Sequence, residues 1–222
     1  MESCMTVTHV VRVLGPCEVN QPAIDSRDTV PGEGIQVVKF AGQLFFSAAI
    51  RRAYDPGCRV DQMPVIEGPR GCGKSQALRL LAIEDAWFSD DLPLDGSARQ
   101  LIEATAGKWI IEVALDQLLD READAAIDRE SAPRRRPSMS LKTFLSRTHD
   151  EARMAYRTTV SCVPRGYIVV GTSCGDCRID LTGSRRISPA NVQRFDLAQL
   201  REVRDQLWAE ARAVHQVKTA FA

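Results

Sequence analysis

The sequence predicts an α/β fold with a phosphate-binding loop, and three observations carry that prediction. Residues 68–75 read GPRGCGKS, which fits the P-loop pattern GxxxxGK followed by Ser or Thr. An apolar run at 63–67 precedes this segment as a strand candidate, and residues 76–82 follow it with helical character. Two more apolar runs, 109–113 and 167–173, are typical of buried strands. Strand, loop and helix in this order favour a nucleotide site over an ordinary glycine turn.

The predicted nucleotide site is centred on this loop. Its glycines allow consecutive backbone N–H groups to turn towards a phosphate, and Lys74 adds a full positive charge. Ser75 supplies a hydroxyl ligand for Mg²⁺. We therefore expect ATP and Mg²⁺ as cofactors. The residues expected at the nucleotide are Gly68, Pro69, Arg70, Gly71, Cys72, Gly73, Lys74, Ser75, Gln76, Thr172 and Ser173.

The composition is that of an ordinary globular protein. The 222 residues are 44% hydrophobic and 26% charged, which excludes the disordered classes and allows one sizeable domain. Lys and Arg total 29, as do Asp and Glu, so affinity for nucleic acid would need a local basic patch. No apolar run approaches the roughly 18 residues that cross a bilayer, and the N-terminus has no signal pattern. We expect a cytoplasmic protein with reduced cysteines and no membrane partner.

The predicted domain follows a short lead-in. Residues 1–36 mix proline, glycine and short Val-rich pieces without a helical period, and we interpret them as loosely structured. Residues 37–222 form the P-loop domain. Its first helix runs from 37 to 54, where Tyr-Asp-Pro-Gly ends it, and the Phe45–Phe46 pair in this helix is assigned to the core.

Glu112 is the candidate for the second acidic motif of the site. It lies near the end of the 109–113 strand, where P-loop enzymes place a carboxylate that helps to hold Mg²⁺. The competing interpretation is an edge-strand glutamate that faces solvent. Upstream, residues 86–93 read as a short strand that enters an acidic turn, and Asp90 and Asp91 there fit a solvated turn better than a cation site.

The remaining segments are helices, a basic loop and an arginine pair. Helices are expected at 97–105, 116–131, 140–148 and 196–216. Arg134, Arg135 and Arg136 lie between prolines in an exposed loop that is either simply solvated or in contact with DNA phosphates. Arg185 and Arg186 are candidates for arginines that stabilise charge on a γ-phosphate, although surface arginines without such a role are common.

Several of these segments together resemble the virulence-associated protein E family of phages and mobile elements. The resemblance includes WFSDDLP at 87–93 and GKWIIE at 107–112. The matching segments fall in one order along the chain, at 54–75, 87–93, 107–112, 142–148, 171–172, 182–186 and 206–211.

The resemblance implies a three-layer P-loop ATPase related to AAA+ proteins and superfamily 3 helicases, with parallel strand order 5-1-4-3-2. It implies an ATP-dependent helicase or translocase that forms a homo-oligomeric ring, expected to be a hexamer, on single-stranded or forked DNA, often together with a primase. Lys74, Ser75 and Glu112 match the family's functional positions. Arg185 or Arg186 matches its expected arginine finger.

The chain departs from the family pattern near the reaction centre. The expected second acid after the strand is missing from its usual position, because Asp116 comes one residue short of it, and the catalytic base is left open. Ser173 and Cys174 stand where Thr-Asn is expected, so the water-orienting amide is missing. Weakened hydrolysis, a nucleotide-binding remnant with a regulatory role, and a small-molecule phosphotransferase therefore remain alternatives.

Overall fold

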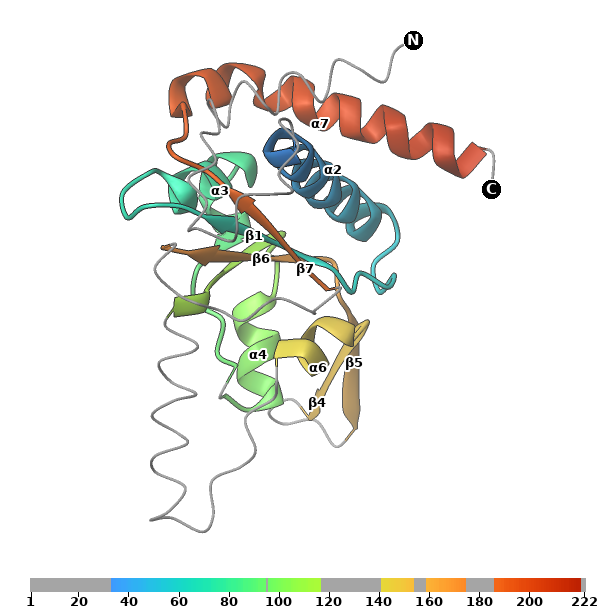
Figure 1. The fold of residues 1–222 in the computed structure, drawn as a ribbon. Helices are drawn as coiled ribbons and strands as arrows, with labels where there is room; N and C mark the ends of the chain where they lie inside the picture. The colour runs from blue at the N-terminus through green and yellow to red at the C-terminus, as the bar shows by residue number, and fades with distance from the viewer. Residues whose placement is uncertain (1–32, 95, 117–140, 154–158, 175–185, 221–222) are drawn as a thin grey trace, which may run out of the picture.

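The computed structural model describes residues 33–94, 96–116, 141–153, 159–174 and 186–220. They form an α/β fold around a five-stranded parallel sheet (Figure 1). Its strands are β1 (Met63–Glu67), β2 (Phe88–Ser89), β3 (Ile110–Ala114), β6 (Ile168–Ser173) and β7 (Ile187–Asn191). Their order is β2-β3-β6-β1-β7, which reads 5-1-4-3-2 from the β7 edge when the five strands are counted in chain order. The predicted α/β class with a central parallel sheet is confirmed.

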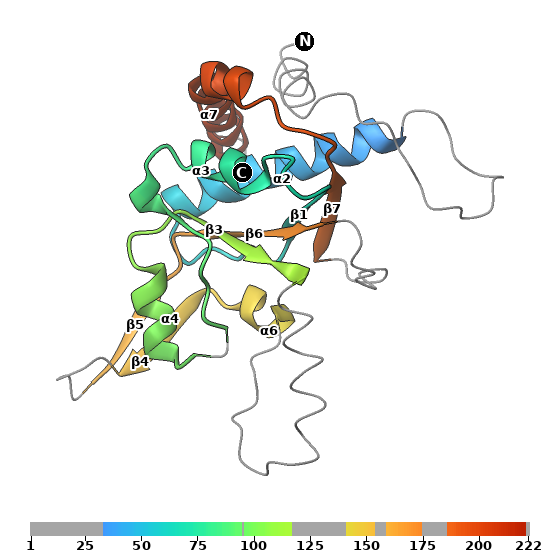
Figure 2. The same ribbon diagram turned by 90° about the vertical axis from the view of Figure 1, so that its left-hand side faces the viewer.

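Helices cover both faces of the sheet (Figures 1 and 2). One face carries α2 (Glu33–Tyr54), α3 (Lys74–Leu81) and α7 (Leu197–Ala220). The other carries α4 (Ala98–Thr105), α6 (Leu141–Ser146) and an antiparallel hairpin of β4 (His149–Arg153) and β5 (Val160–Pro164). A short 3-10 helix (Asp85–Trp87) leads into β2.

The strands divide the core into two layers by alternation. In β3, Ile110 packs with the α2, α3 and α7 layer, whereas Ile111 packs with the α4 and α6 layer. In β6, Val170 and Val169 divide in the same way. Side chains alternate across a strand with period two, so a continuous apolar run serves both layers of a buried parallel sheet.

The aromatic pair that was predicted to lie in the core is buried between α2 and α7. Phe45 and Phe46 are each 6% exposed and pack against Trp208 of α7, with ring centroids 5.9 Å and 4.8 Å from that indole. Trp208 Nε1 donates a hydrogen bond to the Leu81 carbonyl at the end of α3, at 3.1 Å. The core assignment of the pair is confirmed, and the indole ties α7 to α3.

Local capping explains two helix starts. Ser97 caps α4, accepting the Gln100 N–H while the Gln100 side chain accepts from Ser97, which satisfies two N-terminal donors. Asp196 Oδ1 accepts the Gln199 N–H at the start of α7, at 3.0 Å.

The structure differs from the sequence-based expectations at several points. The first helix, α2, begins at Glu33 and not at 37, so it takes in the last four residues of the predicted 1–36 lead-in. Residues 187–191 read only as a short apolar stretch, but they form the edge strand β7, which tolerates Pro189 because an edge strand pairs on one side only. Residues 149–164 contain the β4–β5 hairpin, whose exposed β5 strand lacks a clear alternating pattern. The 116–131 helix and the Arg134–Arg136 loop fall outside the described residues, except that Leu115 and Asp116 begin a helical turn.

Candidate nucleotide site

The 68–75 loop lies at the carboxyl end of β1 and leads into α3. Gly73 precedes the helix with a φ of 92°, in the left-handed region that glycine adopts without strain. A Cβ on Gly68 would stand 2.1 Å from the Val192 carbonyl oxygen, so only glycine allows the loop this close to the end of β7. Strand, loop and helix are therefore arranged so that the N-terminus of α3 points at the space above the loop, where an anion is favoured.

Lys74 bends back over the loop in this structure. Its Nζ donates to the carbonyl oxygens of Gly68 at 2.7 Å and Pro69 at 3.0 Å. The Cys72 sulfur lies 3.7 Å from the same ammonium. The ammonium is thus held at the loop by acceptors that phosphate oxygens can replace, since both are oxygen acceptors.

Glu112 is buried at the centre of the site. Its side chain is 5% exposed, and Oε1 accepts hydrogen bonds from Ser75 Oγ at 2.8 Å and Thr172 Oγ1 at 2.7 Å. Its strand β3 lies between β2 and β6, so the interpretation as a solvent-facing glutamate on an edge strand is wrong.

The second carboxylate oxygen of Glu112 indicates what the site can bind. Oε2 is buried and has no hydrogen-bond partner among the described residues. A buried carboxylate oxygen without a partner is costly unless a cation or donor meets it. Carboxylate and hydroxyl oxygens are ligands that Mg²⁺ prefers, so Glu112 and Ser75 together fit this ion.

Asp116 lies at the same carboxyl ends of the strands as Glu112. Its Oδ1 accepts from Ser173 Oγ at 3.0 Å, and its Oδ2 accepts the Cys174 N–H at 2.9 Å. The sequence pattern places it outside the family's usual spacing, but the helical turn after β3 brings its carboxylate to the end of β6. Three residues lie between it and Glu112, and the change from strand to helical turn at Leu115 places both carboxylates at the carboxyl ends of neighbouring strands.

Glu67 is a further acid at the carboxyl ends of the strands, and no sequence motif points to it. It is the last residue of β1, immediately before the loop, and its carbonyl accepts the Val192 N–H at 2.7 Å. Partial burial raises the pKa of its carboxyl above the ordinary glutamate value.

Arg186 lies at the amino ends of the strands, opposite to the 68–75 loop, and immediately precedes β7. Its carbonyl accepts the N–H of Met63, the first residue of β1, at 2.7 Å, and its Nη1 donates to Ser146 Oγ of α6 at 2.6 Å. Arg186 is separated from the 68–75 loop by the length of β1, which is about 17 Å for five residues. In addition, α6 lies on the face of the sheet away from α3 (Figure 1). Arg186 therefore does not reach the P-loop of its own chain. Arg185 falls outside the described residues.

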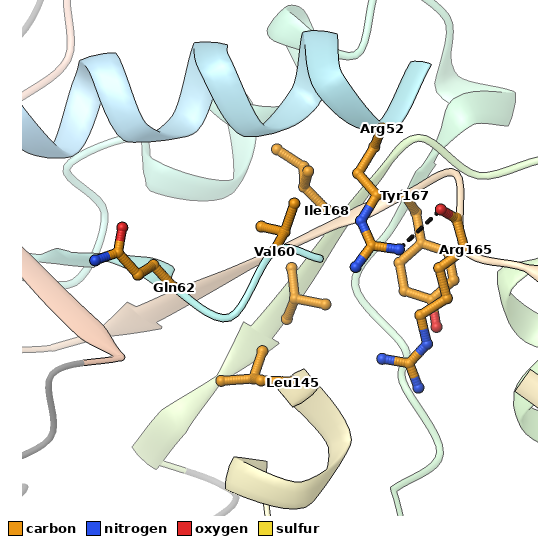
Figure 3. A pocket seen from close by; sticks show the side chains of 8 residues that line it. Arg52, Val60, Gln62, Leu145, Arg165, Tyr167 and Ile168 are labelled. Carbon is orange, nitrogen blue, oxygen red and sulfur yellow. Dashed lines mark hydrogen bonds between the residues drawn. The ribbon is translucent and has the colours of Figure 1, made fainter. Parts of the chain in front are cut away.

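A small cavity also lies near the amino ends of the strands (Figure 3). It has a volume of about 20 Å³, which is room for a single water, and its lining includes Arg52, Gln62, Leu145 and Tyr167. Arg52 lies near the end of α2, Gln62 and Tyr167 immediately precede β1 and β6, and Leu145 lies in α6, so the cavity is separate from the candidate nucleotide site.

Searches of known proteins give one family and a partial structural likeness. A family model described as Virulence-associated protein E-like domain matches residues 32–221. The C-terminal region of NrS-1, in its A form apo structure, aligns with a TM-score of 0.48 and 15% identity over 86% of this chain. A second NrS-1 structure, of residues 305–718, aligns with a TM-score of 0.42 and 14% identity over 85%.

The chain spans about half the length of these solved structures, 47% and 45%. No curated protein matches it significantly. Among the described residues, no helix is long and apolar enough to cross a membrane.

Proposed function

The chain belongs to the virulence-associated protein E-like domain family, and from this premise we propose that it is an ATP-hydrolysing, helicase-like motor of phage or mobile-element replication. The observation that carries the proposal is the buried Glu112 carboxylate, with Ser75 and Thr172 on one oxygen and no described partner on the other. A hydroxyl and a carboxylate held together beside a P-loop are what a phosphate-bound Mg²⁺ needs.

The proposed roles follow from the positions of the side chains. The loop N–H groups and Lys74 hold the β- and γ-phosphates of ATP, and Ser75 and Glu112 hold Mg²⁺. When bound, the ion neutralises charge that develops on the phosphate oxygens. Thr172 fixes the rotamer of Glu112 through its 2.7 Å hydrogen bond. Gln76, in the first turn of α3 beside Ser75, is proposed to face the phosphates as well.

Asp116 is proposed as the second acid of the site. Its carboxylate accepts the N–H of Cys174, the residue that stands where the family pattern has a water-orienting amide, and the 3.0 Å bond from Ser173 fixes it at the tip of β6. An aspartate at that position can accept a proton from the attacking water. The same bond also supports the alternative of a nucleotide-binding remnant, because both oxygens of Asp116 already accept hydrogen bonds within the chain.

Arg186 is proposed to serve the ATP of a neighbouring subunit. Its position at the amino end of the sheet prevents it from completing the site of its own chain, whereas head-to-tail association would bring one subunit's arginine edge to the next subunit's loop. This supports a homo-oligomeric ring, which we propose to be a hexamer. Single-stranded or forked DNA is the proposed substrate of movement and a primase the proposed partner, both from family membership.

Steady-state ATP turnover with and without single-stranded DNA tests the proposal. We expect turnover in wild type that rises when the DNA is added. Lys74→Ala should lose ATP binding, measured by calorimetry, because it removes the ammonium that faces the β- and γ-phosphates. The matched control is Lys108→Ala, whose exposed ammonium contacts the Ala86 carbonyl away from the loop. Retained ATP affinity in Lys74→Ala would contradict the site, and ATP binding without turnover in wild type would favour the remnant.

A further inference from the structure

The side chain of Arg186 is held by a helix of the opposite layer. Its Nη1 donates to the hydroxyl of Ser146, the last residue of α6, at 2.6 Å. Its main chain is fixed separately, because its carbonyl accepts the Met63 N–H at 2.7 Å. The sheet thus places the backbone of Arg186, and α6 places its guanidinium.

The helix that holds Arg186 is itself anchored in the core. Arg165 is 3% exposed and donates from Nη1 to the Phe144 carbonyl at 2.6 Å, two residues before Ser146. Its guanidinium lies 4.1 Å from the centre of the fully buried Phe144 ring. Two further bonds, of 2.8 Å and 2.6 Å, join Arg165 to the buried Asp150 carboxylate. Moving the end of α6 would take the Phe144 carbonyl away from this buried guanidinium and leave one of its donors without its acceptor, which is unfavourable.

We propose that Ser146 is a positioning residue for Arg186, so that the guanidinium is already oriented when it meets the nucleotide of a neighbouring subunit. The inference rests on the proposed function. A free arginine side chain samples many rotamers, and ordering it during the reaction would cost entropy. A guanidinium has five N–H donors, and the bond to Ser146 involves one of them, so this bond by itself does not prevent contact with phosphate oxygens.

Mixed assemblies of two variants test this role, because the subunit whose ATP turnover is measured keeps an unaltered nucleotide loop. In the reference mixture, Lys74→Ala subunits donate an intact Arg186 to Arg186→Ala subunits, which keep an intact P-loop. Composite sites should then turn over ATP above the level of either variant alone. In the second mixture the donor also carries Ser146→Ala. We expect its rescued turnover to fall about tenfold at unchanged KM for ATP, because only the arginine's orientation is lost.

Two further donors separate positioning from general damage. Ser146→Thr keeps the hydroxyl and should restore most of the rescue. Ser47→Ala removes a hydroxyl from the surface of α2, where it bonds only within its own helix to the Leu44 carbonyl, and should leave rescue unchanged. Each donor's thermal unfolding and association with the acceptor are measured in parallel, so that a folding defect is recognised.

The outcomes distinguish the inference from its premise. Equal or higher rescue with the Ser146→Ala donor, while the reference mixture works, would overturn the positioning role and leave the trans-acting arginine intact. No rescue in the reference mixture, with subunits that still associate, would remove the proposed role of Arg186 and the inference with it.

Discussion

Glu112 combines a buried carboxylate with one oxygen that no described residue contacts, and this combination predicts how its amide variant behaves. Glu112→Gln keeps an oxygen that can accept from Ser75 and Thr172 but loses the negative charge that would meet Mg²⁺. We expect the fold and ATP binding to survive and turnover to fall by about 10²-fold or more, in a steady-state assay. Glu103→Gln, on the exposed surface of α4, is the control. Unchanged turnover in Glu112→Gln would move the metal-holding role to another acid, with Asp116 first.

Glu67 predicts a pH dependence of stability. Because partial burial raises the pKa of its carboxyl, the folded protein holds this proton more tightly than the unfolded chain does. Its contribution to the free energy of unfolding is therefore lost as pH rises from the ordinary glutamate range through the raised pKa. Glu67→Gln removes this loss. We expect the melting temperature of the variant to exceed that of wild type by more at about pH 8 than at about pH 5. A difference that is constant with pH would show that burial does not disfavour the charged form.

At the scale of the elements, β6 depends on a glycine in the middle of the sheet. A Cβ on Gly171 would stand 2.9 Å from both Leu115 Cδ1, just after β3, and Val65 Cγ2 of β1. Gly171→Ala should overpack this point and lower the free energy of unfolding by about 1–3 kcal/mol, measured by urea denaturation. Gly166→Ala is the matched control, because a Cβ there meets nothing within 4 Å, and its effect should stay within about 0.5 kcal/mol. A stable Gly171→Ala would show that the three strands can separate enough to admit a methyl group.

The elements that carry a local sequence signal are the ones that the sequence predicts. The strand–loop–helix segment at 63–81 and the strands β3 and β6 follow from local signals, because GPRGCGKS is a fixed pattern and 109–113 and 167–173 are continuously apolar. Glu112 could be selected as a candidate for the same reason, because it lies near the end of the apolar run 109–113.

The partners of Asp116 and Arg186 do not follow from local signals. Asp116 meets Ser173, 57 residues later, and Arg186 meets Ser146, 40 residues earlier. Both contacts depend on strand order and on the depth at which a helix packs, which no short window of sequence contains. The pairing of β4 with β5 does not follow from local signals for a related reason: β5 is mostly exposed, so it lacks the apolar alternation that marks a half-buried strand.

At the scale of the whole molecule, the proposed motor predicts association. Arg186 and the 68–75 loop lie at opposite ends of β1, so in the proposed motor a complete site is made by two subunits. Light scattering after size exclusion should show an oligomer when ATP and single-stranded DNA are present, with Glu112→Gln used to prevent depletion of the nucleotide. A wild-type monomer under these conditions would contradict the ring and favour the remnant or a phosphotransferase.

The placement of loop and arginine at the two ends of β1 also has an arithmetic consequence. In the proposed assembly each subunit is directional, with its nucleotide site at one end and its arginine at the other, so an open row always leaves one nucleotide site and one arginine unmatched. A row of any length then contains one working site fewer than it has subunits. Joining the two ends of the row adds a working site without adding a subunit. Turnover per subunit should therefore rise at the moment of closure, and most visibly for the smallest assemblies.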